Sequence, residues 1–254
     1  MRRVRRGLWM PCVSLIAVAC AGTVPPTSGR DDANGTAMDV ERDARVLQMV
    51  DERRADTMLV DDALRSTSSA TRARAALAIG QVKMRARYVV LRRLLVEVDT
   101  AVAANAAYAL GLAKDSIGAS ALGRAVAGAP DVVAREAAWS LGEIGEVARP
   151  ILLVALGEGS TLPLSQSVAA QRSAAVRAAL IMSTTKLRPV PLSTVTPWCA
   201  DSADDVVRAA AYVIGRQRLA GGVRALLPLF GIANQVLAAI SLAIGTVKIG
   251  RAHV

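Results

Sequence analysis

The fold is decided by the stretch from Val133 to Gly145, which reads VAREAAWSLGEIG. Two earlier stretches align with it without gaps, RARAALAIGQV from Arg72 and VAANAAYALGLA from Val102. Their glycines are spaced by 31 residues (111 − 80 and 142 − 111), at positions Gly80, Gly111 and Gly142. Self-similarity at a fixed period of about 20–50 residues is typical of a repeat protein, so the chain is interpreted as an array.

Further copies of the pattern follow at nearly the same spacing. AYVIG ends at Gly215 and SLAIG at Gly245, which are 30 residues apart (245 − 215). Between these copies and Gly142, the stretch AAVRAALIMS puts Ser183 in the glycine column, displaced by 41 residues (183 − 142). The extra length falls at 157–167, which we expect to be a loop-like insertion.

The aligned columns predict which side chains form the core. Large apolar residues stand three and one positions before the glycine, and a small residue stands four before it, where it would let a neighbouring helix approach. The expected large core residues are Leu77, Tyr108, Trp139, Leu180, Tyr212 and Leu242 in the first column and Ile79, Leu110, Leu141, Met182, Ile214 and Ile244 in the second. The expected close-approach residues are Ala76, Ala107, Ala138, Ala179 and Ala211. The aromatic members are interpreted as packing residues, not as a binding stripe.

Helix ends are predicted from the same alignment. The glycine fits a left-handed residue that ends each helix, and Asp131 and Asp205 are placed to cap helix starts. Shorter amphipathic stretches separate these helices, at 88–98, 119–127, 148–156, 191–200 and 222–230. Each repeat is therefore predicted to be a pair of antiparallel helices, and stacked pairs form one continuous core. The expected fold class is all-α, an α-solenoid.

The pattern V-R-x-x-A-x-x-A-L-G resembles the HEAT-like repeats of the PBS-lyase type. It is matched by Val207 and Arg208, and by the stretch from Ala137 to Gly142. The resemblance covers about 55–247, within an expected array at 37–248 that opens with a cap helix from about Met38 to Arg54. It implies the fold of helix-pair repeats, whereas such arrays serve many partners and lyase activity does not follow.

The N-terminal segment reads as an export signal. Arginines at positions 2, 3, 5 and 6 precede an apolar run, so 1–19 is predicted to be a signal peptide. The run ends IAVAC, which resembles the lipobox of bacterial lipoproteins and implies acylation of Cys20. Ala21, where Asp would favour inner-membrane retention, favours outer-membrane delivery of a lipoprotein that faces the periplasm. Residues 20–36, which contain Pro25, Pro26, Gly29 and Gly35 among scattered Ser, Thr and Asp, are predicted to be a flexible tether.

The net charge does not indicate nucleic-acid binding. The formal charge is +10, and removing the four signal-peptide arginines leaves +6 (10 − 4). The remaining basic residues alternate with acidic ones and form no long run, which is typical of a solvated surface. We therefore expect no nucleic-acid partner.

One group of basic residues is a candidate contact site. Arginines near the starts of the second helices could line one ridge that contacts a partner, although similar arrays use such residues to bridge neighbouring repeats. The members of this candidate ridge are Arg74, Arg135, Arg177 and Arg208.

The residues do not indicate catalysis. The sole histidine is His253, and the sequence has no phosphate-binding loop and no cysteine pair with metal spacing. We predict no catalytic residue, no metal and no cofactor within this chain. Cys199 has no histidine available to activate it and is predicted to be a small core residue.

The C-terminal residues 249–254 read IGRAHV, which matches a translated sequencing adapter, so they are expected to be an assembly artefact on a truncated gene. The preceding apolar segment 236–244 is expected to need a further helical layer.

The predicted function is a membrane-anchored scaffold that binds a protein partner along the solenoid. The alternative is the repeat portion of a lipoprotein that continues into a cyclophilin-type peptidyl-prolyl isomerase, a similarity carried by the opening from Leu47 to Arg54. A third interpretation is a repeat protein that aids chromophore attachment.

Overall fold

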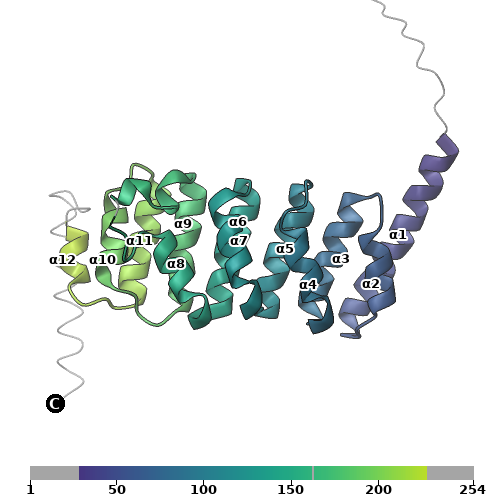
Figure 1. The fold of residues 1–254 in the computed structure, drawn as a ribbon, viewed down its shortest axis with the longest axis horizontal. Helices are drawn as coiled ribbons and strands as arrows, with labels where there is room; N and C mark the ends of the chain where they lie inside the picture. Colours follow the sequence, from purple (N-terminus) through teal and green to yellow (C-terminus); the bar gives the residue numbers. More distant parts are fainter. Residues whose placement is uncertain (1–28, 162, 228–254) are drawn as a thin grey trace, which may run out of the picture.

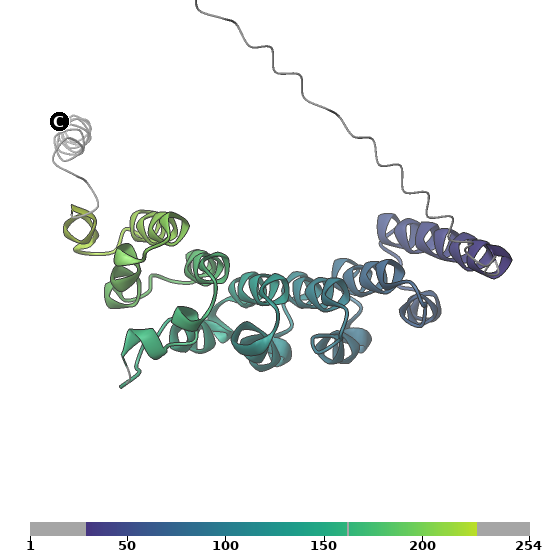
Figure 2. The same cartoon turned by 90° about the horizontal axis from the view of Figure 1, so that it is seen from above.

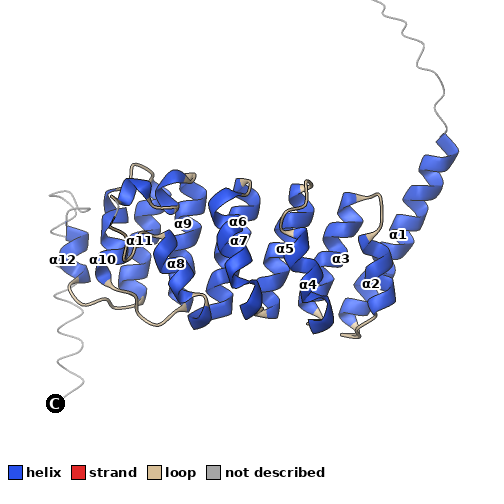
Figure 3. Ribbon diagram, in the orientation of Figure 1, coloured by secondary structure: helices blue, strands red, loops and turns tan. Residues whose placement is uncertain are grey.

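The computed structural model describes residues 29–161 and 163–227, which form helices joined by turns, with no strand in these ranges (Figure 3). The helices stack side by side into an elongated array (Figure 1). The inner layer consists of α1 (Gly29–Asp51), α3 (Ser69–Gln81), α5 (Thr100–Ala113), α7 (Asp131–Ile144), α9 (Ala174–Ser183) and α11 (Asp204–Arg216). The outer layer consists of α2 (Thr57–Leu64), α4 (Tyr88–Leu94), α6 (Ala119–Gly128), α8 (Arg149–Ala155), α10 (Leu192–Val195) and α12 (Gly222–Leu226). The predicted all-α solenoid of helix pairs is confirmed.

Short 3-10 helices supplement the two layers. They are η1 (Arg85–Arg87), η2 (Ser116–Gly118), η3 (Gly145–Val147), η4 (Leu164–Gln166), η5 (Ala169–Gln171), η6 (Thr184–Lys186) and η7 (Thr196–Ala200). The first three lead into outer helices, and η4 and η5 lie in and just after the predicted insertion at 157–167. Viewed from above, the array curves, with the inner layer on the concave side (Figure 2). Among the described helices, none is both long and apolar enough to cross a bilayer.

The N-terminal helix α1 packs on α2 and α3, where the cap helix was predicted. It begins at Gly29, inside the segment 20–36 that was predicted to be a flexible tether, so the helical part of the chain starts earlier than expected. Once packing of buried Val46 and Met49 has ordered a helix, each further residue adds a hydrogen bond without a new nucleation cost. The signal peptide, Cys20 and the C-terminal segment from 228 lie outside the described residues.

The repeated glycines do not end their helices, contrary to the prediction. None of the described repeat glycines has a positive φ; each lies within an inner helix. A Cβ on Gly80 would lie 2.5 Å from the carbonyl oxygen of Ala109, and one on Gly111 would lie 2.8 Å from the Cα of Ser140. At Gly80, Gly111 and Gly142, glycine is therefore required because the next inner helix approaches too closely for any side chain, whereas a Cβ on Gly215 would meet no described atom within 4 Å.

The fourth copy has a different register from the one predicted. Gly142 packs on Ser183, just as Gly111 packs on Ser140, so these two serines are equivalent and the displacement is 43 residues (183 − 140). Leu180 and Ile181 are buried accordingly, whereas Met182, predicted to be a core residue, is 39% exposed. Earlier copies follow their predicted register, and Ala138 is fully buried.

The predicted helix caps are also corrected. Asp131 is the first residue of α7 and follows Pro130, and Asp205 lies within the first turn of α11, so neither side chain caps its helix start. Side-chain caps occur instead at Asp56, Ser68, Asp99 and Ser173, whose oxygens accept hydrogen bonds from backbone N–H groups in the first turn.

Inner helices end in a recurring turn. The N–H of Lys83 donates to the carbonyl of Gly80 (3.2 Å), and the next N–H, of Met84, donates to that of Ile79 (3.0 Å). This pair of bonds is the Schellman motif, whose closing residue takes a left-handed conformation. The same pair recurs after α1, α5 and α11. The left-handed residues at these four ends are Arg53, Lys83, Lys114 and Arg218, with φ of 50°, 58°, 52° and 51°.

Candidate interaction surface on the inner layer

A line of large apolar side chains runs across the inner layer, one from each of its helices after α1. In the corrected register all stand three positions before the glycine column, and each is at least partly exposed. We call this set the inner stripe; its members are Leu77, Tyr108, Trp139, Met182 and Tyr212.

The exposure of the inner stripe contradicts the prediction that this column fills the core. Buried positions in α5 and α7 lie one, two, four and five residues before the glycine, so the third position points away from both neighbouring layers. Leu180 is buried because it does not belong to this column, and Leu242 lies outside the described residues. The pattern had indicated apolar character correctly, but it assigned these side chains to the wrong face of the helix.

The stripe has defined geometry. The rings of Tyr108 and Trp139 stack with centroids 4.4 Å apart and planes inclined by 23°. Towards the C-terminal end, Tyr212 is 53% exposed and contributes with Met182 to a hollow of about 600 Å³ between α9 and α11. Exposed aromatic and methionine side chains are enriched where proteins bind other proteins, because aromatic rings offer large contact areas at low entropic cost and the flexible methionine side chain adapts to the partner's surface.

Mostly small residues lie two helical turns before the inner stripe, nearer the N-terminus of each inner helix. The exposed positions seven before the stripe are Ala70, Ala101, Val132, Ala175 and Asp205. Four of these five are apolar, so the concave face is more apolar than an ordinary solvated helix face.

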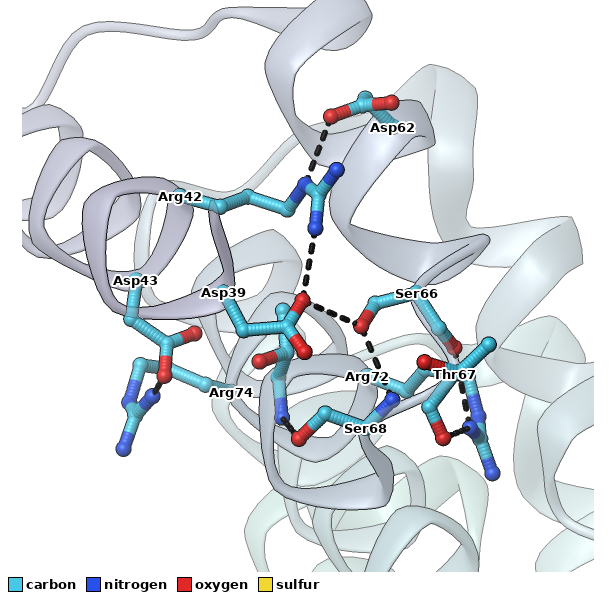
Figure 4. Close-up of polar contacts among 10 residues, drawn as sticks. Asp39, Arg42, Asp43, Asp62, Ser66, Thr67, Ser68, Arg72 and Arg74 are labelled. Atoms are coloured by element: carbon cyan, nitrogen blue, oxygen red, sulfur yellow. Dashed lines mark hydrogen bonds and ion pairs between the residues drawn. The ribbon is translucent and has the colours of Figure 1, made fainter. Parts of the chain in front are cut away.

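Two members of the predicted arginine ridge are structural instead. Arg74 forms an ion pair with Asp43 on α1 (Figure 4). The guanidinium of Arg177 binds Asp201 (2.8 Å) and also donates to the carbonyl of Arg172 (2.7 Å). Its side chain is only 15% exposed, which leaves little surface for a partner.

The other two members share one column and remain exposed. Arg135 and Arg208 precede Trp139 and Tyr212 by four residues, which is one helical turn on the same face. Their ion pairs are local, with Glu136 at 3.9 Å and Asp205 at 2.5 Å. The four arginines therefore form no continuous ridge, but Arg135 and Arg208 lie beside the inner stripe.

A polar network at the N-terminal end fixes the cap helix. Arg42 bridges Asp39 (2.6 Å) and Asp62 (2.7 Å), and Ser66 donates to Asp39 (2.7 Å) (Figure 4). Because these groups join α1 to α2 and to the turn before α3, they hold the first layer of the array in register.

The structure also shows the surroundings of Cys199 and of the possible metal ligands. Cys199 is buried and unpaired, as predicted for a core residue, and burial raises the pKa of its thiol. Among the residues whose side chains the structure describes, 37–161 and 163–227, no three His, Cys, Asp or Glu side chains gather as metal ligands would.

The chain has the fold of a HEAT-like helical-repeat solenoid. The comparison with solved structures finds the complex of CpcE and CpcF of phycocyanin lyase from Nostoc sp. PCC7120, with a TM-score of 0.50 and 19% sequence identity. The match covers 70% of this chain and 71% of that chain. No protein-family model and no curated protein matches the sequence. The comparison confirms the PBS-lyase-type repeat fold that the sequence pattern resembles, and at this identity it bears on the fold alone.

Proposed function

We propose that this protein is a non-catalytic scaffold that binds a protein partner through the inner stripe. The observation that supports the proposal is the line of partly or fully exposed apolar side chains on the concave face, with Tyr108 stacked on Trp139. Burial of a large aromatic side chain by a partner contributes roughly 1.5–3 kcal/mol, so a few such residues can carry an interface. The similar phycocyanin lyase structure is a complex of two proteins, which is consistent with this mode of action.

Site-specific photo-crosslinking in the native bacterium tests the proposal. A photoreactive amino acid at Met182 or Tyr212 should give a discrete adduct with one protein. The same probe at Val154, an exposed residue of the outer helix α8, is the control and should give none. Combining Trp139→Ala with either inner probe should reduce the adduct without unfolding the array, because Trp139 is only partly buried. Equal adducts from inner and outer positions would contradict an inner binding surface.

We also propose that the scaffold is a periplasm-facing lipoprotein, anchored through Cys20 and delivered to the outer membrane. The basic start, the apolar run and the IAVAC sequence support this. Two or three acyl chains would hold the protein on a membrane, since each buried methylene contributes about 0.8 kcal/mol. The protein should incorporate labelled palmitate in a Gram-negative host and lose the label on Cys20→Ala. Unlabelled, soluble wild-type protein would exclude the anchor.

The alternative, peptidyl-prolyl isomerase activity from a cyclophilin-type domain encoded beyond this chain, stays a prediction. Sequencing the gene in the native bacterium past the codon for Val247 tests it directly.

A further inference from the structure

A row of cations lies along one edge of the array. Because the inner helices run parallel to one another, their Schellman turns close at the same edge, and the turns after α1, α3 and α5 lie along the lower edge in Figure 1. The left-handed residue of each turn is basic. We call this set the basic edge; its members are Arg53, Lys83, Lys114 and Arg218.

The backbone at these positions disfavours the residues found there. A left-handed conformation is costly for any residue with a Cβ, and glycine is the usual choice at this position. In α7 the position three residues after the repeat glycine is Gly145, with φ of 82° and ψ of −141°, so this helix ends in a different glycine turn. Among the described residues, every non-glycine with a positive φ is one of the four cations. Repetition of an unfavourable choice, always with a basic side chain, points to a function that is separate from folding.

These charges are not used in internal ion pairs. No member of the basic edge forms a salt bridge with another described residue, and all four are exposed. Near the opposite ends of the inner helices, by contrast, Arg72, Arg172 and Arg177 are paired with Glu97, Asp131 and Asp201. Favourable interaction with the helix C-termini can explain a preference for cations here, but it does not explain why cations replace glycine.

The surface along the basic edge is also hollowed and carries exposed apolar side chains. Arg53 and Lys83 border one hollow of about 640 Å³, and Lys114 borders another of about 360 Å³. Met58 and Ile117, which follow α1 and α5 at the same edge, are 83% and 73% exposed. Hollows bordered by cations and by exposed apolar side chains can accommodate the side chains of another protein.

We propose that the basic edge is a second docking surface, which binds an acidic segment of a protein through carboxylates that pair with successive repeats. Duplex nucleic acid fits less well, because it carries a phosphate charge every ~1.7 Å of its axis, whereas the left-handed cations of the edge are one or more repeats apart and acidic residues border the same hollows, Asp51 beside Arg53 and Lys83 and Asp115 beside Lys114. A flat anionic bilayer cannot enter the hollows. The basic edge is distinct from the inner stripe, and either surface could exist without the other.

Binding of a fluorescent oligoglutamate peptide at low salt tests the basic edge. All variants are made in the full chain with Cys20→Ala, which removes the proposed lipid. The edge variant combines Lys83→Gln, Lys114→Gln and Arg218→Gln. The control combines Arg65→Gln, Arg93→Gln and Arg124→Gln, which removes the same charge from exposed arginines that form no salt bridge with described residues. Three lost ionic contacts should weaken binding roughly tenfold in the edge variant, whereas the control should change little.

A second edge variant separates binding from folding. Glycine at Lys83, Lys114 and Arg218 should weaken peptide binding equally while raising the melting temperature, because the left-handed conformation then costs less. Equal loss of binding in edge and control variants would overturn the proposal, since net charge alone would explain it. Tighter, edge-dependent binding to phosphatidylglycerol vesicles or duplex DNA than to oligoglutamate would also overturn it, by assigning the edge to a different partner.

Discussion

At the scale of single residues, the absence of a side chain sets how closely two inner helices pack. A Cβ at Gly111 would overlap the Cα and Cβ of Ser140, both 2.8 Å away, on a helix that cannot move without disturbing the next layer. Gly128, at the end of α6, has no such neighbour within 4 Å. The two glycines therefore serve different roles although both are helical.

We expect Gly111→Ala to lower the free energy of unfolding by about 1–3 kcal/mol, through overpacking of the α5–α7 contact. Gly128→Ala is the matched control and should be neutral or stabilising by up to about 1 kcal/mol, because alanine is the better helix former. Urea denaturation followed by circular dichroism measures both. Equal midpoints for Gly111→Ala and wild type would mean that α5 and α7 are farther apart than described.

A single ion pair should make stability depend on pH. Burial by itself raises the pKa of Asp201, but hydrogen bonds from Arg177 and from the N–H of Ala203, with the charge of Arg177, outweigh it and the pKa is lowered. A lowered folded-state pKa stabilises the protein above the unfolded value of about 3.9, and this contribution is lost as the pH falls through the folded value.

Arg177→Gln should therefore destabilise the protein most near neutral pH. The difference in unfolding free energy from wild type should shrink as the pH falls below about 4, where Asp201 becomes protonated in both proteins. Denaturant titrations at several pH values measure this difference. A difference that stays constant down to pH 3 would show that the pair does not control the titration of Asp201.

At the scale of secondary-structure elements, the register of α9 decides which of its apolar residues support the core. Ile181 is fully buried and Met182 belongs to the exposed inner stripe, although the sequence alignment had assigned Met182 to the core. We expect Ile181→Ala to cost about 2–5 kcal/mol, as a cavity in the core does. Met182→Ala should cost under about 1 kcal/mol. Chemical denaturation compares them directly, and the reverse order would restore the register predicted from sequence.

At the scale of the whole molecule, the array is stabilised by contacts between neighbouring layers. Each inner helix packs mainly on the inner helices before and after it and on adjacent outer helices. The largest contacts of the terminal helix α1 are with α2 and α3. A defect at one end of such an array loosens nearby repeats first and leaves distant ones intact.

Arg42→Gln removes the side chain that joins Asp39 to Asp62, and should therefore loosen the N-terminal end. We expect faster amide hydrogen exchange in α1 and α2, with unchanged protection in α7 and α9, as measured by mass spectrometry. Arg45→Gln is the control, because Arg45 lies on the same helix but is exposed. Uniformly faster exchange along the array would show that the protein unfolds as one cooperative unit instead.

The residue order alone predicts the helix-pair repeat, because a period of 31 residues and the regular placement of Ala, Leu and Gly satisfy the packing rules of stacked helices. It also indicated the insertion, the N-terminal cap helix and the buried state of Cys199. These features depend on local composition or on a repeated spacing of residue types, and both can be read directly from the sequence.

The packing of the folded chain shows which face of the inner helices is exposed and why glycine recurs at Gly80, Gly111 and Gly142. Apolar periodicity cannot tell a core residue from a concave-surface residue, so Tyr108 and Trp139 were predicted to be packing residues. The register of α9 depends on the contact of Ser183 with Gly142, across a variable insertion. The basic edge arises because equivalent turns meet at one side of a stacked array, although Lys83 and Lys114 are isolated cations in the sequence.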